Sequence, residues 1–349
     1  MDMSNACIFC LNPPSEAPLS DEHVISMSLG GNLVLPQAAC RDCNSALGHM
    51  LEGPLVNGLE YFRWAFGIER RDGQVPNTQW QTTIEGKTVA FVVDKNGHTR
   101  FEPILLMKRT HPDGRTEVVY RCQREADARR VERRLRRRHP EVTLEPTGPN
   151  QRGDVEGEYT GSLAFLATEP VLRCVAKYGY TYAIHVRGSD FAVREELQPL
   201  RDWIRPGKDM PPGCCFLIGS RRLLRQLGKS PPRHRIMVVG NGRQRALYAF
   251  VGILGLFWYY VILCEQYAGP DWFSLHEFDP IERTAVEQPL ALYGFPEVDL
   301  QELKEATEGQ RVKVAREAFV RGIWVYNRLC AGGGLPPRPG GTPGPIQPA

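Results

Sequence analysis

The stretches Cys7-Ile8-Phe9-Cys10 and Cys40-Arg41-Asp42-Cys43 place four thiols in two CxxC pairs near the start of the chain. Each pair can bend as a knuckle that offers two sulfur atoms to one ion, and four thiolates close a tetrahedral structural zinc site. The alternative is four unrelated buried cysteines. We expect one structural Zn²⁺, and its expected ligands are Cys7, Cys10, Cys40 and Cys43.

The segment between the two pairs has 29 residues, which is more than a simple zinc ribbon requires. Leu19–Ser26 (LSDEHVIS) is typical of a short strand, and Leu29-Gly30-Gly31 is typical of a loop. Asn44 directly follows the second cysteine pair and is predicted to open a helix over residues 44–52. We therefore expect the cysteine pairs to hold a strand, a loop and a helix together.

Taken together, these motifs resemble those of the HNH endonucleases, in particular the branch with the pattern CxxC…EHVI…LGG…CxxCN…G. The matching stretches are CIFC, DEHVISMSLGG and CRDCNSALGHMLE, and the resemblance covers about residues 7–52. It implies a ββα-metal fold, in which a two-stranded hairpin packs on a helix and one divalent ion lies between them. It also implies an enzyme that hydrolyses phosphodiester bonds of DNA.

The resemblance carries three roles onto this sequence by position. His23 corresponds to the general base, and Glu22 and Asn44 correspond to the ligands of a catalytic Mg²⁺ or Mn²⁺. Carboxylate and amide oxygens are hard ligands that suit these ions, and a neutral imidazole can take a proton from the attacking water. Successive strand residues point to opposite faces, so Glu22 and His23 can serve one cleft only if the strand twists or bulges.

The sequence departs from the family pattern in small ways. Where the family often has an asparagine that holds the loop of the base, this chain has Gln37, and Asn32 is the alternative for that supporting role. Ser26 stands where many members have proline. His49 lies off the face of Asn44, so a contact with solvent or phosphate is favoured over a role as metal ligand. Glu52 could support the metal ligands from behind, but a position at a solvated helix end is favoured.

An arginine-rich segment follows at residues 121–138. Residues 121–138 hold nine arginines against three acids, with apolar residues at helical spacing. Arginine forks match phosphate groups, so the helix is a candidate DNA-binding surface. The alternative is a solvated amphipathic helix with local ion pairs, and the two interpretations are about even. The candidate contact residues are Arg129, Arg130, Arg133, Arg134, Arg136 and Arg137.

Residues 246–264 (ALYAFVGILGLFWYYVILC) are apolar enough to cross a bilayer. Interior glycines and many Val, Ile, Phe and Tyr residues favour two buried β-strands joined near Gly252–Gly255. Residues 1–20 lack the pattern of a signal peptide. We therefore expect a cytoplasmic protein with no membrane segment, and a membrane-anchored effector is the less favoured alternative.

The remaining sequence predicts an α+β protein of several parts. Hydrophobic residues make up 42% of the chain, and the net charge of +3 does not by itself indicate a polyanion partner. The expected elements are a helix over 55–66, a hairpin within 79–107 that turns at 94–97, a strand over 118–122, helices over 124–138, 169–186, 192–204 and 300–330, and strands of one sheet over 214–219, 234–239, 246–251 and 256–264. The expected parts are an HNH module over 1–54, a mixed region over 55–148, an α+β domain over 162–330 and a disordered Pro/Gly-rich tail over 331–349.

Two functions compete. The first is a divalent-metal-dependent endonuclease that cuts or nicks DNA, with RNA as a further substrate class and a protein partner or oligomer left open. The second is a non-catalytic, zinc-bearing nucleic-acid-binding or adaptor protein that retains the HNH frame. The presence of Glu22, His23 and Asn44 together favours the enzyme.

Overall fold

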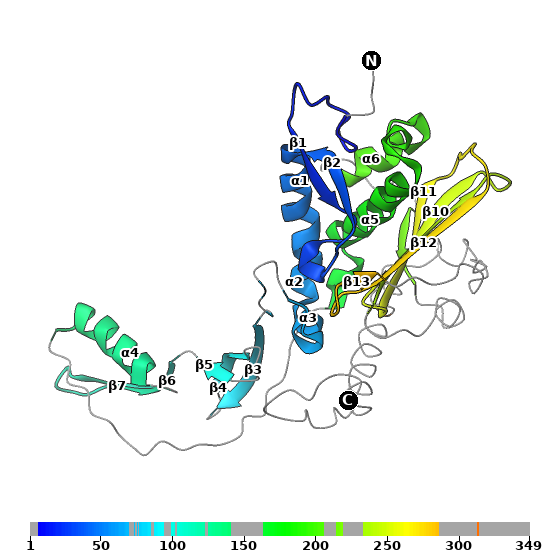
Figure 1. The fold of residues 1–349 in the computed structure, drawn as a ribbon. Helices are drawn as coiled ribbons and strands as arrows, with labels where there is room; N and C mark the ends of the chain where they lie inside the picture. The colour runs from blue at the N-terminus through cyan, green and yellow to red at the C-terminus, as the bar shows by residue number, and fades with distance from the viewer. Residues whose placement is uncertain are drawn as a thin grey trace. The chain divides into compact units, whose positions relative to one another are not determined.

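The described residues of the computed structural model form two compact units (Figure 1). One unit lies within 1–75 and 162–336, and the other lies within 76–161. The sequence instead predicted a boundary at residue 54 and a separate domain over 162–330. The structure describes residues 6–69, 73, 75, 77–84, 87–93, 99–101, 103–122, 125–140, 163–205, 214–218, 233–285 and 313.

The larger unit begins with a β-hairpin that leads into a helical segment. The second strand runs directly into the helix, because the Cys40 sulfur accepts a hydrogen bond from the Cys43 backbone N–H and caps the helix. The helix therefore begins at Arg41, three residues before the predicted start. The elements are β1 (Leu19–His23), η2 (Met27–Leu29), β2 (Val34–Cys40), α1 (Arg41–Leu47), the π-helix η3 (Gly48–Glu52), α2 (Gly53–Gly58) and α3 (Glu60–Phe66).

An antiparallel six-stranded sheet forms the other side of this unit, in the order β13-β12-β9-β10-β11-β8. All four strands predicted for one sheet are confirmed. Two further strands, β12 and β13, were not predicted. The bounds are β8 (Cys215–Leu217), β9 (His234–Asn241), β10 (Ala246–Ile253), β11 (Phe257–Cys264), β12 (Trp272–Asp279) and β13 (Thr284–Ala285).

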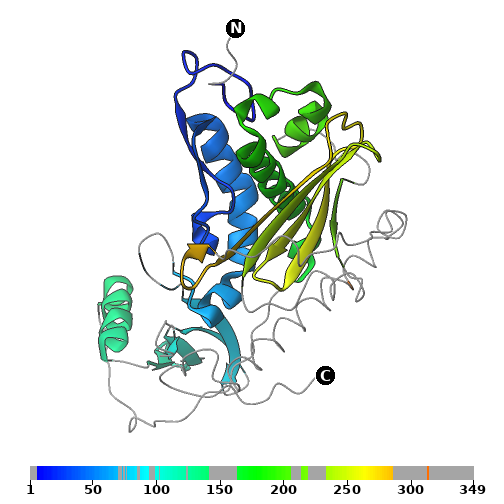
Figure 2. The same ribbon diagram turned by 45° about the vertical axis from the view of Figure 1, so that its right-hand side comes forward.

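Helix α5 (Glu169–Arg187) lies between the sheet and the N-terminal helices (Figures 1 and 2). It is buried along residues 171–184, because one side packs on the sheet and the other on α2 and η3. The shorter elements around it are η4 (Leu163–Ala167), η5 (Ser189–Phe191), η6 (Glu195–Leu197) and α6 (Gln198–Ile204), so the helix predicted over 192–204 is regular only in its last part.

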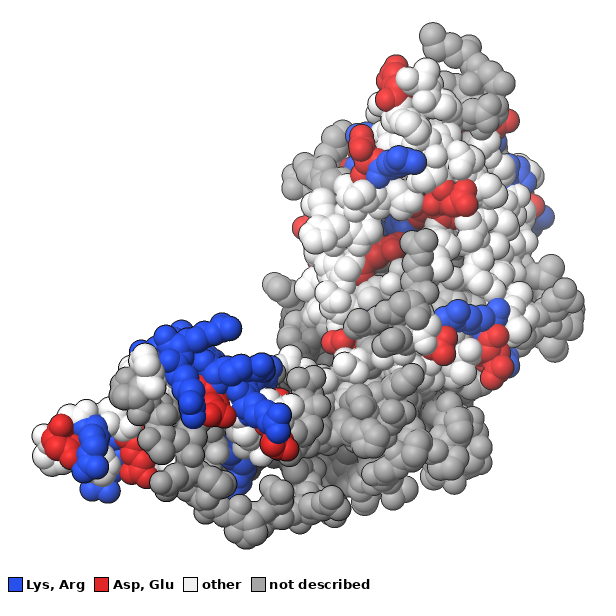
Figure 3. All heavy atoms as spheres, turned by 60° about the vertical axis from the view of Figure 1, so that its left-hand side comes forward, with Lys and Arg blue, Asp and Glu red and all other residues white. Residues whose placement is uncertain are grey.

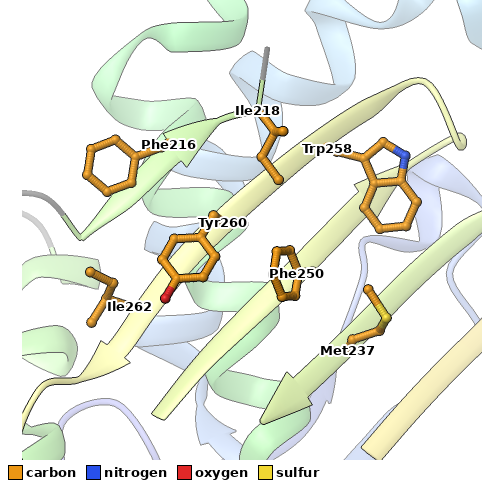
Figure 4. Packing of buried hydrophobic residues seen from close by; sticks show 7 residues of the cluster. All are labelled: Phe216, Ile218, Met237, Phe250, Trp258, Tyr260 and Ile262. Atoms are coloured by element: carbon orange, nitrogen blue, oxygen red, sulfur yellow. The ribbon is translucent and has the colours of Figure 1, made fainter. Parts of the chain in front are cut away.

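The two faces of the sheet carry different residue sets. A Cβ on Gly179 of α5 would meet Ala249, Leu263 and Val251, which are odd-numbered positions of β10 and β11. Successive strand residues alternate between faces, so the even-numbered positions point away from α5. Figure 4 shows the aromatic and aliphatic cluster on that second face, made of Phe216, Ile218, Met237, Phe250, Trp258, Tyr260 and Ile262.

The apolar stretch 246–264 forms β10 and β11, as predicted. Leu254 and Gly255 both have positive φ, at 56° and 64°. Two successive positive φ values suit the right-handed twist of a hairpin. No helix among the described residues is long and apolar enough to cross a membrane.

The smaller unit contains two sets of strands and one helix. The predicted hairpin within 79–107 and the predicted helix are both present, although the turn over 94–97 lies outside the described residues. The linker over 149–161, the helix predicted over 300–330 apart from Lys313, and the tail over 331–349 also lie outside them. The elements are β3 (Thr78–Ile84), β4 (Lys87–Val93), β5 (Thr99–Phe101), β6 (Ile104–Thr110), β7 (Thr116–Arg121) and α4 (Glu125–Arg138).

Candidate active site

The four cysteines of the CxxC pairs come together at one end of the hairpin. Their sulfur atoms all lie within 4.8 Å of one another, and the Cys10 and Cys40 sulfurs are 3.8 Å apart. A tetrahedral zinc site with bonds of about 2.3 Å has sulfur–sulfur edges of about 3.8 Å. The cluster therefore fits a structural Zn²⁺, and the ligands would be Cys7, Cys10, Cys40 and Cys43.

The protein geometry already perturbs these thiols. A hydrogen bond from the Cys43 side chain lowers the pKa of Cys7 to about 4, whereas burial raises the pKa of Cys10 to about 11. The Ile8 N–H donates to the Ala38 carbonyl at 2.9 Å, which ties the first knuckle to the end of β2. Because zinc binds thiolates, the preformed cluster is suited to bind the ion and release the remaining protons.

The hairpin is irregular immediately before the Glu22-His23 pair. Ser20 lies opposite Ala39 and Glu22 lies opposite Leu35, so the register shifts at Asp21. Gln37 has a positive φ of 49° within this bulge. Its backbone N–H donates to the Asp21 carboxylate at 3.0 Å, so the contact comes from the main chain rather than from the expected side-chain amide.

Asn44 joins the helix to the first strand. Its amide nitrogen donates to the Ser20 hydroxyl at 3.0 Å and to the Asp21 carbonyl at 2.9 Å. These two hydrogen bonds fix the first turn of α1 against the strand that carries His23. Both hydrogen bonds use the amide nitrogen of Asn44. The amide oxygen is the atom that was expected from the sequence to bind the catalytic Mg²⁺ or Mn²⁺.

Glu22 has a different environment from the one that a metal ligand needs. Its side chain is 1% exposed and forms an ion pair with Lys177 of α5. The same ammonium lies 2.5 Å from a carboxylate oxygen of Glu52, whose side chain is 16% exposed. Glu52 is therefore not at a solvated helix end, which corrects that expectation, because the helical segment continues into α2.

The electrostatics of this triad keep the lysine charged. Burial alone would lower the pKa of Lys177, but the charges of Glu22 and Glu52 outweigh it and raise the pKa above its ordinary value. Burial raises the pKa of Glu22, against the effect of Lys177. Lys177 pairs with one oxygen of the Glu22 carboxylate, and the other oxygen, Oε2, is buried without a hydrogen-bond partner among the described residues. Because the side chain is only 1% exposed, Glu22 and Asn44 as placed do not form an open ligand pair for a divalent ion.

Residues 7–60 match the HNH endonuclease family model. These residues form an HNH endonuclease domain. The match spans both cysteine pairs, the hairpin and the helices α1 and α2. No curated protein and no solved structure matches the chain.

Steric crowding and backbone conformation explain why glycine stands at positions 30 and 31 of the HNH domain. Gly30 has a φ of 91°, a conformation that side chains rarely adopt. A Cβ on Gly31 would lie 2.0 Å from the Ile25 carbonyl oxygen. The loop after the Glu22-His23 pair therefore closes only with glycine at both positions.

The Asn32 amide donates to the Arg283 carbonyl at 3.3 Å, so it contacts the segment before β13.

The C-terminal part of the larger unit supplies contacts to the HNH domain that the sequence did not reveal. The Tyr180 hydroxyl donates to the Ile8 carbonyl at 2.6 Å, and the Ser26 N–H donates to the Tyr178 hydroxyl at 3.4 Å. His234 of β9 lies 2.9 Å from the Leu29 carbonyl. The one available signal was Lys177 itself, a lysine within an otherwise largely apolar helix.

The remaining site residues differ in exposure. His23 is half-buried and lies opposite Val34 in the hairpin. His49 is exposed on η3, as expected for a residue in contact with solvent. A π-helix adds one residue to each turn and often marks functional positions in helices. Here it ends at Glu52, the residue that reaches Lys177.

Proposed function

We propose that the chain is a metal-dependent nuclease that hydrolyses phosphodiester bonds of DNA with His23 as the general base. The match of residues 7–60 to HNH endonucleases is the observation that carries the proposal. The hydrogen bonds from Asn44 to β1 support it, because they hold the helix beside the strand of His23.

In the proposed reaction, the neutral imidazole of His23 accepts a proton from a water molecule. The water oxygen attacks phosphorus, the bond from phosphorus to the leaving oxygen breaks, and that oxygen acquires a proton from solvent. Proton transfer of this kind typically contributes a factor of about 10²–10⁴ to the rate. A protonated His23 cannot accept the proton, so activity should fall as the pH drops through the histidine range.

A catalytic Mg²⁺ or Mn²⁺ is part of the proposal, since such an ion stabilises the charge that develops on phosphate oxygens. The sequence suggested Glu22 and Asn44 as its ligands. Glu22 is buried and paired with Lys177, so the pair as placed does not fit an ion. We therefore derive no catalytic step through the metal.

Helix α4 supports a nucleic-acid substrate. Its candidate arginines are all exposed, and Figure 3 shows Lys and Arg side chains gathered on this part of the chain. Ion pairs link Arg129 to Glu125, Arg130 to Asp127 and Arg136 to Glu132. No described acid pairs with Arg133, Arg134 or Arg137, so these guanidinium groups are available to phosphates.

The test compares His23→Ala with His49→Ala, a matched change at an exposed histidine of the same domain. Purified protein is incubated with supercoiled plasmid and Mg²⁺ or Mn²⁺, and nicked and linear products are measured. His23→Ala should lower the rate by about 10²–10⁴, while zinc content and DNA binding stay unchanged. His49→Ala should keep the wild-type cleavage rate at saturating DNA, because an exposed side chain in contact with solvent or phosphate transfers no proton of the reaction. Equal cleavage by His23→Ala and the wild type contradicts the assigned base.

The alternative is a zinc-bearing nucleic-acid-binding protein without catalysis. The observation in its favour is the Glu22–Lys177 pair, which occupies one expected ligand of the catalytic ion. This alternative predicts DNA or RNA binding with no cleavage of plasmid, single-stranded DNA or RNA in either metal. The same assay, extended to these substrates, separates the two functions.

A further inference from the structure

Lys177 is a charged side chain that α5 inserts between two elements of the HNH domain. It lies within the buried run 171–184, and its side chain is 2% exposed. Its ammonium pairs with Glu22 on β1 and with Glu52 at the end of η3. Because the three residues belong to three different elements, the triad fixes the strand and the helical segment relative to α5.

The direction of Glu22 determines that of its neighbour. Glu22 and His23 lie opposite Leu35 and Val34, so the pairing is regular at both positions and the bulge precedes them. Adjacent residues of a regular strand point to opposite faces. While Lys177 holds the Glu22 carboxylate on one face, the His23 side chain leaves the strand on the other.

Separating the ion pair between Lys177 and Glu22 is energetically unfavourable. A buried charge that loses its partner is strongly unfavourable, and both side chains are almost fully buried here. Lys177 contacts only Oε1 of Glu22, and Oε2 has no hydrogen-bond partner among the described residues, but the whole side chain is buried, so binding of a hydrated ion would require β1 or α5 to move. The carboxylate next to His23 thus has an occupied, structural position.

We propose that Lys177 is a positioning residue of the nuclease site, which holds Glu22 and thereby fixes the direction of the His23 imidazole. Glu22 anchors β1 instead of binding the catalytic ion. The inference rests on the proposed nuclease function. It makes α5, which lies outside the matched residues 7–60, a necessary part of the site.

The informative variant is the double change Lys177→Met with Glu22→Gln, because it removes both fully buried charges, while Glu52, whose side chain is 16% exposed, keeps contact with solvent. A displacement of about 1 Å at a reacting group can cost about 10²-fold in rate. We expect kcat for plasmid cleavage to fall by about 10–10²-fold, while the Mn²⁺ concentration for half-maximal rate stays unchanged. The matched control is Arg235→Met with Glu277→Gln, which removes another buried ion pair, on the sheet.

Two results would overturn the inference. A rise of tenfold or more in the half-maximal Mn²⁺ concentration would identify Glu22 as a ligand of the ion. An unchanged kcat in a double variant that retains the wild-type melting temperature would make the triad structural only. The control pair should leave both kcat and the Mn²⁺ dependence at wild-type values.

A second readout does not depend on cleavage. In protein with isotope-labelled histidine, the His23 ring resonances should move in the Lys177/Glu22 double variant, whereas those of exposed His49 should not. The control pair should leave His23 unchanged. If the wild type cuts no nucleic acid but His23 shifts as expected, the nuclease proposal fails while the positioning contact stands. Unchanged His23 resonances in the double variant rule the contact out.

Discussion

Among single residues, His234 shows how tightly the sheet holds the HNH domain. It is fully buried, lies 2.9 Å from the Leu29 carbonyl oxygen, and accepts a hydrogen bond from the Leu254 N–H at 3.5 Å. Burial lowers its pKa to about 4. The ring is therefore neutral in the folded protein and donates to the loop that follows the Glu22-His23 pair.

This histidine should make folding sensitive to mild acid. The unfolded chain binds the proton near pH 6.5 and the folded chain near pH 4, so the stability from the neutral ring is complete above pH 6.5 and is lost as pH falls toward 4. Between pH 7 and pH 5 the loss is about 2 kcal/mol. The variant His234→Gln keeps an N–H donor but does not titrate. Between pH 7 and pH 5, its free energy of unfolding, measured with urea, should therefore fall by about 2 kcal/mol less than that of the wild type. An identical pH dependence in the variant would mean that other groups control it.

Residue-level prediction from sequence succeeded where the signal was local. The spacing of Cys7, Cys10, Cys40 and Cys43 predicted their cluster, because each CxxC pair forms its own knuckle. The Glu22–Lys177 pair spans more than 150 positions in the chain, and nothing near either residue marks its partner. The expected ligand role of Glu22 came from the resemblance alone and took no account of α5.

Among the elements, α4 offers a direct test of nucleic-acid binding. Arg130, Arg133, Arg134 and Arg137 follow helical spacing of three and four residues, so they share one face. Three of the six candidates, Arg129, Arg130 and Arg136, pair with acids of the same helix. Unpaired arginines should contribute more to phosphate binding than paired ones.

The experiment removes three charges from α4 in two different ways. Replacing Arg133, Arg134 and Arg137 with alanine should weaken DNA binding and reduce the log–log salt slope by about 0.9 for each phosphate that the protein no longer neutralises. Replacing Arg129, Arg130 and Arg136 should change the slope less, since each of these is paired with an acid. Equal slopes in both variants and the wild type would show that α4 is a solvated face.

The sequence predicted elements best where apolar residues formed an uninterrupted or periodic pattern. β10 and β11 were predicted from their Val, Ile and aromatic residues, and α4 from its apolar positions at helical spacing. β12 (WFSLHEFD) was not predicted, because it has no uninterrupted apolar run like those of β10 and β11, although its partial alternation of apolar and polar residues is compatible with a strand. Its pairing with β9 decides its structure, and that pairing is not visible in the segment itself.

The larger unit is built from two separate stretches of the chain, one within residues 1–75 and the other within residues 162–336. Residues within 76–161 form a compact unit of their own, while α5 and the sheet rejoin the HNH domain. The sequence-based division was placed at residue 54 because the HNH motifs end there, whereas the packing continues beyond that residue. Phe62 of α3 illustrates the point, since its ring contacts Phe257 of β11 with centroids 5.3 Å apart.

This architecture predicts opposite outcomes for two deletions. A fragment of residues 1–75 lacks Tyr180, Lys177 and His234, which bind Ile8, Glu22 and Leu29 in the full chain, so it should unfold without cooperativity even when zinc is supplied. A chain in which a flexible Gly/Ser linker replaces 76–161 keeps all three of these interactions. It should bind zinc and unfold cooperatively, and it should bind DNA more weakly because α4 is gone. Calorimetry, zinc analysis and DNA titration measure the three properties, and a cooperatively folded 1–75 fragment would show that the HNH domain does not need α5 and the sheet.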